Sequence, residues 1–385
     1  RQWRAQLFRR RGGVLNGIDV LVKQDFEPLA GMRVGLVTNH SALARDRETT
    51  IDLLHSSPRV KLVRLFSPEH GIRGTAEGKV GDTTDRKTGL KIHSLYGSTR
   101  KPSPTLLKGL DALVFDIQDI GCRFYTYIST MGNCMEAADA AGLKFVVLDR
   151  VNPIGADRVE GPLLDGARSF TGYHEIPVRH GMTVGEMAKL FKAERHRNTD
   201  LTVIPVQGWK RDQRFDKTGL PWVNPSPNIR NLTAATLYPG LGLLEFTNLS
   251  VGRGTKLPFE LVGAPYIEPK ALAQRLQAFR LRGLDFVPIH FTPEGSKFAG
   301  ERCGGVRILL KREDADTVDL GIALALALRE LHPRDWETKN LNKLLVHPAT
   351  QKAILSGQAL AEIRRLWQAD LQRFAERRDG VLLYR

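Results

Sequence analysis

The sequence predicts an α/β protein built on a parallel sheet, followed by a smaller α+β region. Short, almost wholly apolar runs such as 32–39, 60–66 and 143–148 alternate with helical segments. Strands that are buried on both faces give continuous apolar runs, and their alternation with helices is typical of a parallel sheet covered by helices. The composition then changes beyond residue 218, which indicates a second structural unit.

The first half of the chain accounts for most of the predicted sheet. The helix predicted at 183–194 begins with a capping box, in which Thr183 is followed three residues later by Glu186. Residues 73–89 are rich in Gly, Thr and Asp and predict a loop over the site. The remaining expected elements are strands at 32–39, 60–66, 91–96, 111–117, 143–148 and 201–206 and helices at 47–56, 105–109 and 129–141.

Gly, Pro and Asn crowd together between residues 218 and 265, which predicts long loops, and loops of this length are usually functional. We therefore place a domain boundary near residue 232. The chain divides into a basic leader (1–15), a catalytic domain (16–232) and a smaller α+β domain (233–385). The last is expected to hold helices at 269–280 and 317–331, strands at 286–291 and 305–310, and helical segments from 348 to 378.

The composition narrows the possible functions. No apolar run is long enough to span a bilayer. The formal charge of +15 favours an anionic partner, but the basic residues are spread along the chain and form no nucleic-acid-binding signature. An anionic surface or another anionic polymer therefore explains the charge better than nucleic acid. The sequence indicates nothing about the oligomeric state.

No cofactor or metal is expected. The three cysteines form no Cys-x-x-Cys pair, and His70, His174 and His180 lack the spacing of helical metal ligands. The segment 252–256 lacks the pattern of a phosphate-binding loop, and 240–242 lacks the third glycine of a dinucleotide-binding turn.

Acidic residues follow two of the predicted strands. Glu69 comes directly after the strand at 60–66, between Pro68 and His70. Asp116 ends the strand at 111–117, and Asp119 falls in the turn that follows. Ligands of open α/β sheets bind outside the carboxyl ends of the strands, and glycoside cleavage normally needs two carboxyl groups that face one bond. Glu69 is therefore a candidate acid. The alternatives are a surface-turn glutamate and two aspartates that cap turns.

Arginines and aromatic residues occupy the neighbouring loops. Arg123, Arg150 and Arg253 lie between apolar elements, where a guanidinium group can hold a carboxylate through two parallel hydrogen bonds. In so basic a chain, any one of them could equally be a surface residue. Aromatic residues could present ring faces to a sugar or simply pack in the core; these are Tyr125, Tyr127, Trp222 and Tyr238.

Taken together, these motifs resemble the exo-β-N-acetylmuramidases of the NamZ family. The likeness is carried, in one order along the chain, by segments 17–21, 35–39, 66–74, 116–127, 149–153, 225–228, 238–240, 245–255 and 258–260. It implies a Rossmann-like first domain, a smaller domain that closes the cleft, and release of N-acetylmuramic acid from the non-reducing end of peptidoglycan fragments. It also implies an exported, extracytoplasmic protein of cell-wall recycling. Val151 departs from the proline expected there.

The resemblance implies that Glu69 is the catalytic acid and makes Asp116 and Asp119 candidates for the second catalytic group. Three routes stay open: an aspartate as base or nucleophile, attack by the substrate's own 2-acetamido oxygen with an aspartate orienting it, or a tyrosine nucleophile such as Tyr125. The alternative function is a non-catalytic cell-wall glycan-binding protein. At least one of the three arginines is expected to hold the lactyl carboxylate. The predicted substrate-binding residues are His70, Gln118, Arg123, Tyr125, Arg150, Asn152, Asn228, Tyr238, Glu245, Asn248 and Arg253.

Overall fold

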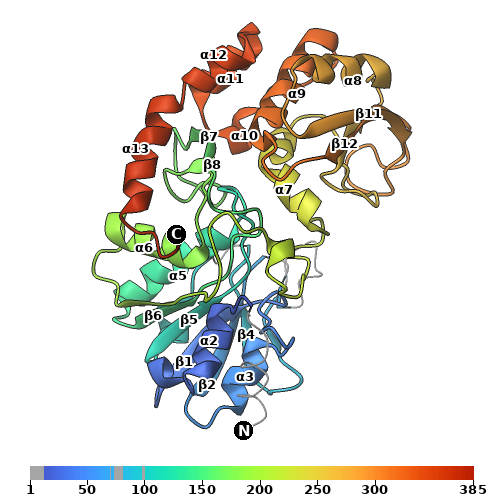
Figure 1. Ribbon diagram of the computed structural model, residues 1–385. Coiled ribbons are helices and arrows are strands. Elements are labelled where there is room, and N and C mark those ends of the chain that lie inside the picture. The colour runs from blue at the N-terminus through green and yellow to red at the C-terminus, as the bar shows by residue number, and fades with distance from the viewer. Residues whose placement is uncertain (1–12, 70, 73–80, 98–99) are drawn as a thin grey trace.

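The described residues form a seven-stranded and a three-stranded sheet, each with its own helices, and a separate two-stranded pair (Figure 1). The computed structural model describes residues 13–69, 71–72, 81–97 and 100–385. The larger sheet has seven strands in the order β3-β4-β2-β1-β5-β6-β9, and the smaller has three in the order β10-β12-β11. The predicted fold class is confirmed. The basic leader up to residue 12, His70 and residues 73–80 of the predicted loop lie outside the described residues.

The large sheet is parallel except at its edge, where β3 pairs antiparallel with β4. The chain runs outward from β1 through β2 to β4, then returns to the other side of β1 with β5. The strand order therefore reverses between β1 and β5. Open α/β sheets bind ligands at such a reversal. The strands are β1 (Arg33–Thr38), β2 (Lys61–Ser67), β3 (Thr83–Thr84), β4 (Lys91–Ser94), β5 (Ala112–Asp116), β6 (Lys144–Leu148) and β9 (Leu201–Ile204).

Helices cover both faces of this sheet, which explains the apolar character of its strands. Successive side chains of a strand point to opposite faces. In β5, Leu113 and Phe115 pack in the core that contains α5 and α6, and Ala112 and Val114 pack in the core that contains α2 and α3. The helices are α2 (Gly17–Lys23), α3 (Thr50–Ser56), α4 (Pro104–Leu107), α5 (Tyr127–Ala140) and α6 (Val184–Glu194), with 3-10 turns at Glu27–Leu29 and Phe215–Lys217.

The capping box predicted at Thr183 is present, since its hydroxyl accepts the Glu186 amide and the Glu186 carboxylate accepts the Thr183 amide. Besides the two 3-10 turns and the short strand β3, which lies in the predicted loop 73–89, three elements of this half were not predicted. They are α2, β7 (Glu160–Leu163) and β8 (Pro177–Arg179), of which the last two form an antiparallel pair.

The stretch 218–265 is more structured than the sequence predicts. It contains α7 (Leu232–Leu241), a 3-10 turn at Gly242–Leu244 and β10 (Leu261–Ala264). The glycines there serve close packing as well as turns. A Cβ atom on Gly240 would lie 1.9 Å from the Thr317 carbonyl oxygen, and one on Gly321 would lie 2.3 Å from the Gly240 oxygen. The prediction of loops throughout this stretch was wrong. Glycine was interpreted as a turn residue, whereas Gly240 allows its helix to pack closely against the helix that contains Gly321.

The second unit packs α7, α8 and α9 with the small antiparallel sheet. Its remaining elements are α8 (Pro269–Ala278), β11 (Leu284–Phe291), β12 (Cys303–Leu310) and α9 (Thr317–Leu331), close to the predicted positions. None of the helices in the described residues is both long and apolar enough to cross a bilayer.

The last helices leave this unit and return along the first one (Figure 1). The Tyr384 hydroxyl donates to the Asp149 carboxylate at 2.5 Å and accepts from the Val206 amide at 2.8 Å. The end of the chain is therefore fastened to the carboxyl end of β6. These helices are α10 (Asn342–Leu345), α11 (Pro348–Ser356), α12 (Leu360–Arg365) and α13 (Gln368–Asp379).

Candidate active site

Glu69 lies just beyond the carboxyl end of β2, where Pro68 ends the strand. The Thr126 hydroxyl donates to its Oε2 at 2.7 Å. Burial and a hydrogen bond with Glu69 raise the pKa of the Tyr96 phenol to about 12, so this hydroxyl stays protonated beside the acid. Two hydroxyl groups from separate elements thus hold the Glu69 side chain, which is half-buried.

A second acid lies opposite in the other unit. Glu245 pairs with Arg253, whose Nη2 is 2.6 Å from Oε1, and the Lys297 amine donates to the Glu245 carbonyl oxygen. Burial raises the pKa of Glu245; Arg253 and Lys297 act against this, and the charge of Glu69 adds to it. The effect of the Glu69 charge on the pKa of Glu245 indicates that these two acids, one from each unit, lie in the same region.

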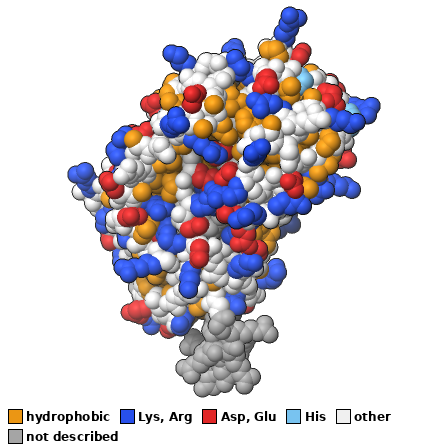
Figure 2. Space-filling model, turned by 45° about the horizontal axis from the view of Figure 1, so that its top comes forward, with side chains coloured by type: hydrophobic (Ala, Val, Ile, Leu, Met, Phe, Trp, Pro, Cys, Tyr) orange, Lys and Arg blue, Asp and Glu red, His pale blue; other side chains and the backbone are white. Residues whose placement is uncertain are grey.

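Glu245, Arg253 and Lys297 line a pocket of about 290 Å³ together with Phe246 and Ser250. Phe246 is 45% exposed, which is unusual for so large an apolar side chain and leaves its ring open to a ligand. Figure 2 shows acidic side chains gathered near the centre of one face, with lysines and arginines around them. Sequence reasoning missed Phe246 and Lys297; Phe246 lies inside a matching motif, and Lys297 has no motif around it.

The predicted tyrosines pack on one another. The Tyr125 ring lies edge-on to those of Tyr127 and Tyr238, with centroids 5.0 and 5.8 Å apart. The Tyr127 hydroxyl donates to the Pro225 carbonyl oxygen at 2.7 Å. Burial raises the pKa of Tyr125 and Tyr238 well above that of a free phenol. A phenolate nucleophile is therefore disfavoured at Tyr125, and these rings form a buried wall.

Asp116 and Arg150 form a buried ion pair at the reversal of the strand order. Arg150 Nε lies 2.5 Å from Asp116 Oδ1, and Nη2 lies 3.0 Å from Oδ2. The Thr50 hydroxyl also donates to Oδ2, at 2.5 Å, and Arg150 Nη1 donates to the Leu43 carbonyl oxygen. Both carboxylate oxygens already have strong partners within the protein. This geometry favours a structural role for Asp116 and Arg150.

Asp119 is also buried but keeps one oxygen without a partner. Its Oδ2 accepts the Gly121 amide at 2.7 Å and lies 3.3 Å from His180 Nε2, whereas Oδ1 has no hydrogen-bond partner in the described part of the chain. Gln118 and Asn152 donate to main-chain carbonyl oxygens of Asp119, Val151 and Met182 and shape this turn. Asp119 is therefore the aspartate that still has an acceptor to offer.

Arg123 is placed away from any pocket. Its guanidinium group is completely buried and donates to the carbonyl oxygens of Pro162, Ile176, Leu344 and Leu345. The expectation that Arg123 binds substrate does not agree with this geometry, because the group joins the β7–β8 pair to α10. A buried arginine in the core was not foreseeable from its loop-like sequence context.

Asn248 and Asn228 were predicted to bind substrate, but neither lines the pocket at Arg253. The Asn248 side chain donates to the Asp335 carbonyl oxygen and accepts from the Glu337 amide, so it holds loops of the second unit together. Asn228 is buried in the segment before α7. Of the predicted binding residues, Glu245 and Arg253 line the pocket of about 290 Å³, whereas Gln118 and Arg150 line a much smaller one of about 10 Å³.

Comparison with known proteins places this geometry in a family. The N-terminal and C-terminal models of the family "Exo-beta-N-acetylmuramidase NamZ" match residues 34–233 and 236–384. The chain is 42% identical over 378 residues to the peptidoglycan β-N-acetylmuramidase NamZ of Bacillus subtilis, covering 96% of this chain and 91% of that protein.

Two crystal structures of DUF1343-family proteins from Bacteroides fragilis share the fold. One has a TM-score of 0.91 at 35% identity and covers 97% of this chain and 100% of that one. The other has a TM-score of 0.79 at 32% identity and covers 97% and 99%.

Proposed function

Because the chain belongs to the exo-β-N-acetylmuramidase NamZ family, we propose that it is an exo-acting glycosidase that releases N-acetylmuramic acid from the non-reducing end of peptidoglycan fragments. The observation that carries the proposal is the position of Glu69. It lies at a strand end, held by Thr126 and Tyr96, and its charge acts on Glu245, which lines the pocket at Arg253 in the other unit.

Glu69 is proposed to protonate the departing glycosidic oxygen. A carboxylic acid in this role must be held in place, because proton transfer needs hydrogen-bond distance to the leaving oxygen. The hydroxyl groups of Thr126 and Tyr96 hold the Glu69 carboxyl group in this way. The transition state has oxocarbenium character, which nearby carboxylates stabilise.

Arg253 is proposed to bind the lactyl carboxylate of the muramic acid. Arg150 is committed to Asp116, and Arg123 to four carbonyl oxygens. The Arg253 side chain is 39% exposed, and Lys297 adds a second cation to the same pocket. A volume of about 290 Å³ suits one sugar, as an exo-acting enzyme requires for the unit that it removes.

The second catalytic group is proposed to be either a carboxylate or the substrate's acetamido oxygen. Asp119 supports both routes through its unpartnered Oδ1, and Glu245 is a further carboxylate coupled to Glu69. A muramic-acid thiazoline distinguishes them. Strong competitive inhibition is expected for substrate assistance, whereas a glycosyl-enzyme adduct detected by mass spectrometry is expected for a carboxylate nucleophile.

The test of the function itself is release of free N-acetylmuramic acid from a chromogenic β-glycoside and from the MurNAc-GlcNAc disaccharide. A glycosidase turns over many substrate molecules. The alternative, a non-catalytic glycan-binding protein, would bind the disaccharide in calorimetry and release no sugar from either compound.

An extracytoplasmic site of action in cell-wall recycling is part of this proposal. Its support is the proposed substrate, which occurs outside the cytoplasmic membrane, and the net charge of +15, which suits anionic wall polymers. Immunodetection in fractionated cells of the source organism tests it. Recovery with the cytoplasmic fraction alone would contradict it.

A further inference from the structure

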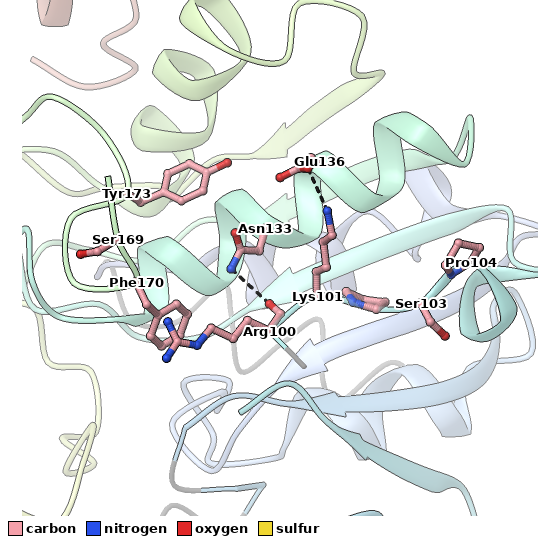
Figure 3. A pocket seen from close by; sticks show the side chains of 10 residues that line it. Arg100, Lys101, Ser103, Pro104, Asn133, Glu136, Ser169, Phe170 and Tyr173 are labelled. Atoms are coloured by element: carbon pink, nitrogen blue, oxygen red, sulfur yellow. Dashed lines mark hydrogen bonds and ion pairs between the residues drawn. The ribbon is translucent and has the colours of Figure 1, made fainter. Parts of the chain in front are cut away.

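A second and larger pocket lies on the first unit. Its volume is about 590 Å³, and it is formed by the segment before α4, one face of α5 and the loop that contains Phe170 and Tyr173 (Figure 3). None of its residues was predicted as a site residue. Its volume is about twice that of the pocket at Arg253, so it accommodates a ligand of more than one sugar.

The charge of this pocket is set by Arg100. Its guanidinium carbon lies 4.4 Å above the centre of the Phe170 ring, and the Asn133 side chain donates to its carbonyl oxygen at 3.2 Å. The nearby Lys101 amine is paired with Glu136 at 2.8 Å. Within the described chain no carboxylate pairs with Arg100, so the guanidinium fork points into the pocket stacked on a ring and able to hold an anion.

Tyr96 and α5 link this pocket to Glu69. The Tyr96 phenol, which hydrogen-bonds Glu69, has its ring 6.4 Å from that of Phe170 and feels the charge of Arg100. Along α5, Thr126 binds Glu69 and Asn133 lines the pocket. Seven residues separate them, which is two helical turns on one face and about 10 Å. Two sugar units span such a distance.

We infer that this pocket is the subsite for the leaving part of the glycan chain, and that Arg100 stacked on Phe170 binds a carboxylate of the next muramyl residue. The inference rests on the proposed function. It assigns a direction to the substrate: the released sugar occupies the small pocket at Arg253, the scissile oxygen lies at Glu69, and the remaining chain follows α5 toward Arg100. The carboxylate belongs to a lactyl group in a peptide-free chain and to the stem peptide in a peptide-bearing one.

Binding of the leaving trisaccharide GlcNAc-MurNAc-GlcNAc, measured by calorimetry, tests the subsite without any catalysis. Arg100→Ala is expected to raise its Kd about tenfold, the usual worth of one charge-assisted contact. Arg100→Lys should recover part of the affinity, since it keeps the charge and loses the planar fork. Arg275 stacks on Phe279 at the same 4.4 Å in the other unit, so Arg275→Ala is the matched control and should leave the Kd unchanged.

Hydrolysis provides the second measurement. Arg100→Ala should lower kcat/KM about tenfold on the MurNAc-GlcNAc-MurNAc-GlcNAc tetrasaccharide and less than about twofold on the chromogenic monosaccharide, whose leaving group does not reach the pocket. A peptide-bearing tetrasaccharide shows which carboxylate is bound. Equal trisaccharide affinity in wild type and Arg100→Ala would overturn the subsite. Trisaccharide binding that depends on Arg100, with no hydrolysis of any substrate, would support the subsite and refute the proposed function.

Discussion

Two polar regions lie at the carboxyl ends of β5 and β2, the strands on either side of β1, and differ in how their charged groups are paired. At β5, the Asp116 carboxylate and the Arg150 guanidinium satisfy each other, buried and with good geometry. Beyond β2, Glu69 is held by two hydroxyl groups and remains half-buried, and Arg253 is partly exposed. Asp116 and Arg150 therefore stabilise the fold. Glu69 and Arg253 remain accessible to a ligand.

The largest effect on activity is expected at Glu69. Glu69→Gln should lower kcat on the chromogenic muramic-acid glycoside by roughly three orders of magnitude, because general acid catalysis supplies about 10² to 10⁴. Its melting temperature should equal that of the wild type, since the amide oxygen can still accept from Thr126. Glu376→Gln, on the exposed side of α13, is the control. An active Glu69→Gln enzyme would remove Glu69 from the catalytic role.

At the buried pair of Asp116 and Arg150, the large effect is expected on stability. Arg150→Ala leaves the Asp116 carboxylate buried without its cation, which should lower the free energy of unfolding by about 3–5 kcal/mol in urea titrations. Arg253→Ala is the matched arginine variant and should cost less than about 1 kcal/mol, because its pair with Glu245 is partly exposed. Similar losses in the two variants would abolish the distinction between the regions.

Arg253 should instead affect substrate selection. Arg253→Ala is expected to lower kcat/KM about tenfold on muramic-acid glycosides and much less on the N-acetylglucosamine analogue, which has no lactyl carboxylate. Parallel assays of the two glycosides provide the measurement. If both substrates lost activity equally, Arg253 would have a general role in the site and none in specificity.

A further effect is expected in the pH dependence of stability. Burial raises the pKa of Asp149 from 3.8 to about 7, so the folded state binds this proton more tightly than the unfolded state does. Protonation of Asp149 stabilises the folded state. This contribution is fully present below about pH 4 and is lost as the pH rises through about 7. Asp149→Asn should therefore flatten the unfolding free energy between these pH values. An unchanged profile would show that Asp149 does not titrate in this range.

Much of the first unit follows from local sequence. The apolar runs of β1, β2, β5 and β6 could be predicted because they are buried on both faces, and the α6 capping box because it is a local hydrogen-bond pattern. The helix α7 could not, since its Gly240 and Pro239 resemble a loop and only contact with Gly321 explains the glycine.

The sequence by itself determined the fold class and the position of an acid at the end of β2, because strand periodicity and the break at Pro68 are properties of adjacent residues. Tertiary structure decided which charges are free. Arg123, Arg150 and Arg253 have similar sequence surroundings, yet one binds carbonyl oxygens, one an aspartate, and one lines an open pocket. That difference depends on partners more than 25 residues away in the chain for the first two and on exposure for the third, and neither can be read from neighbouring residues.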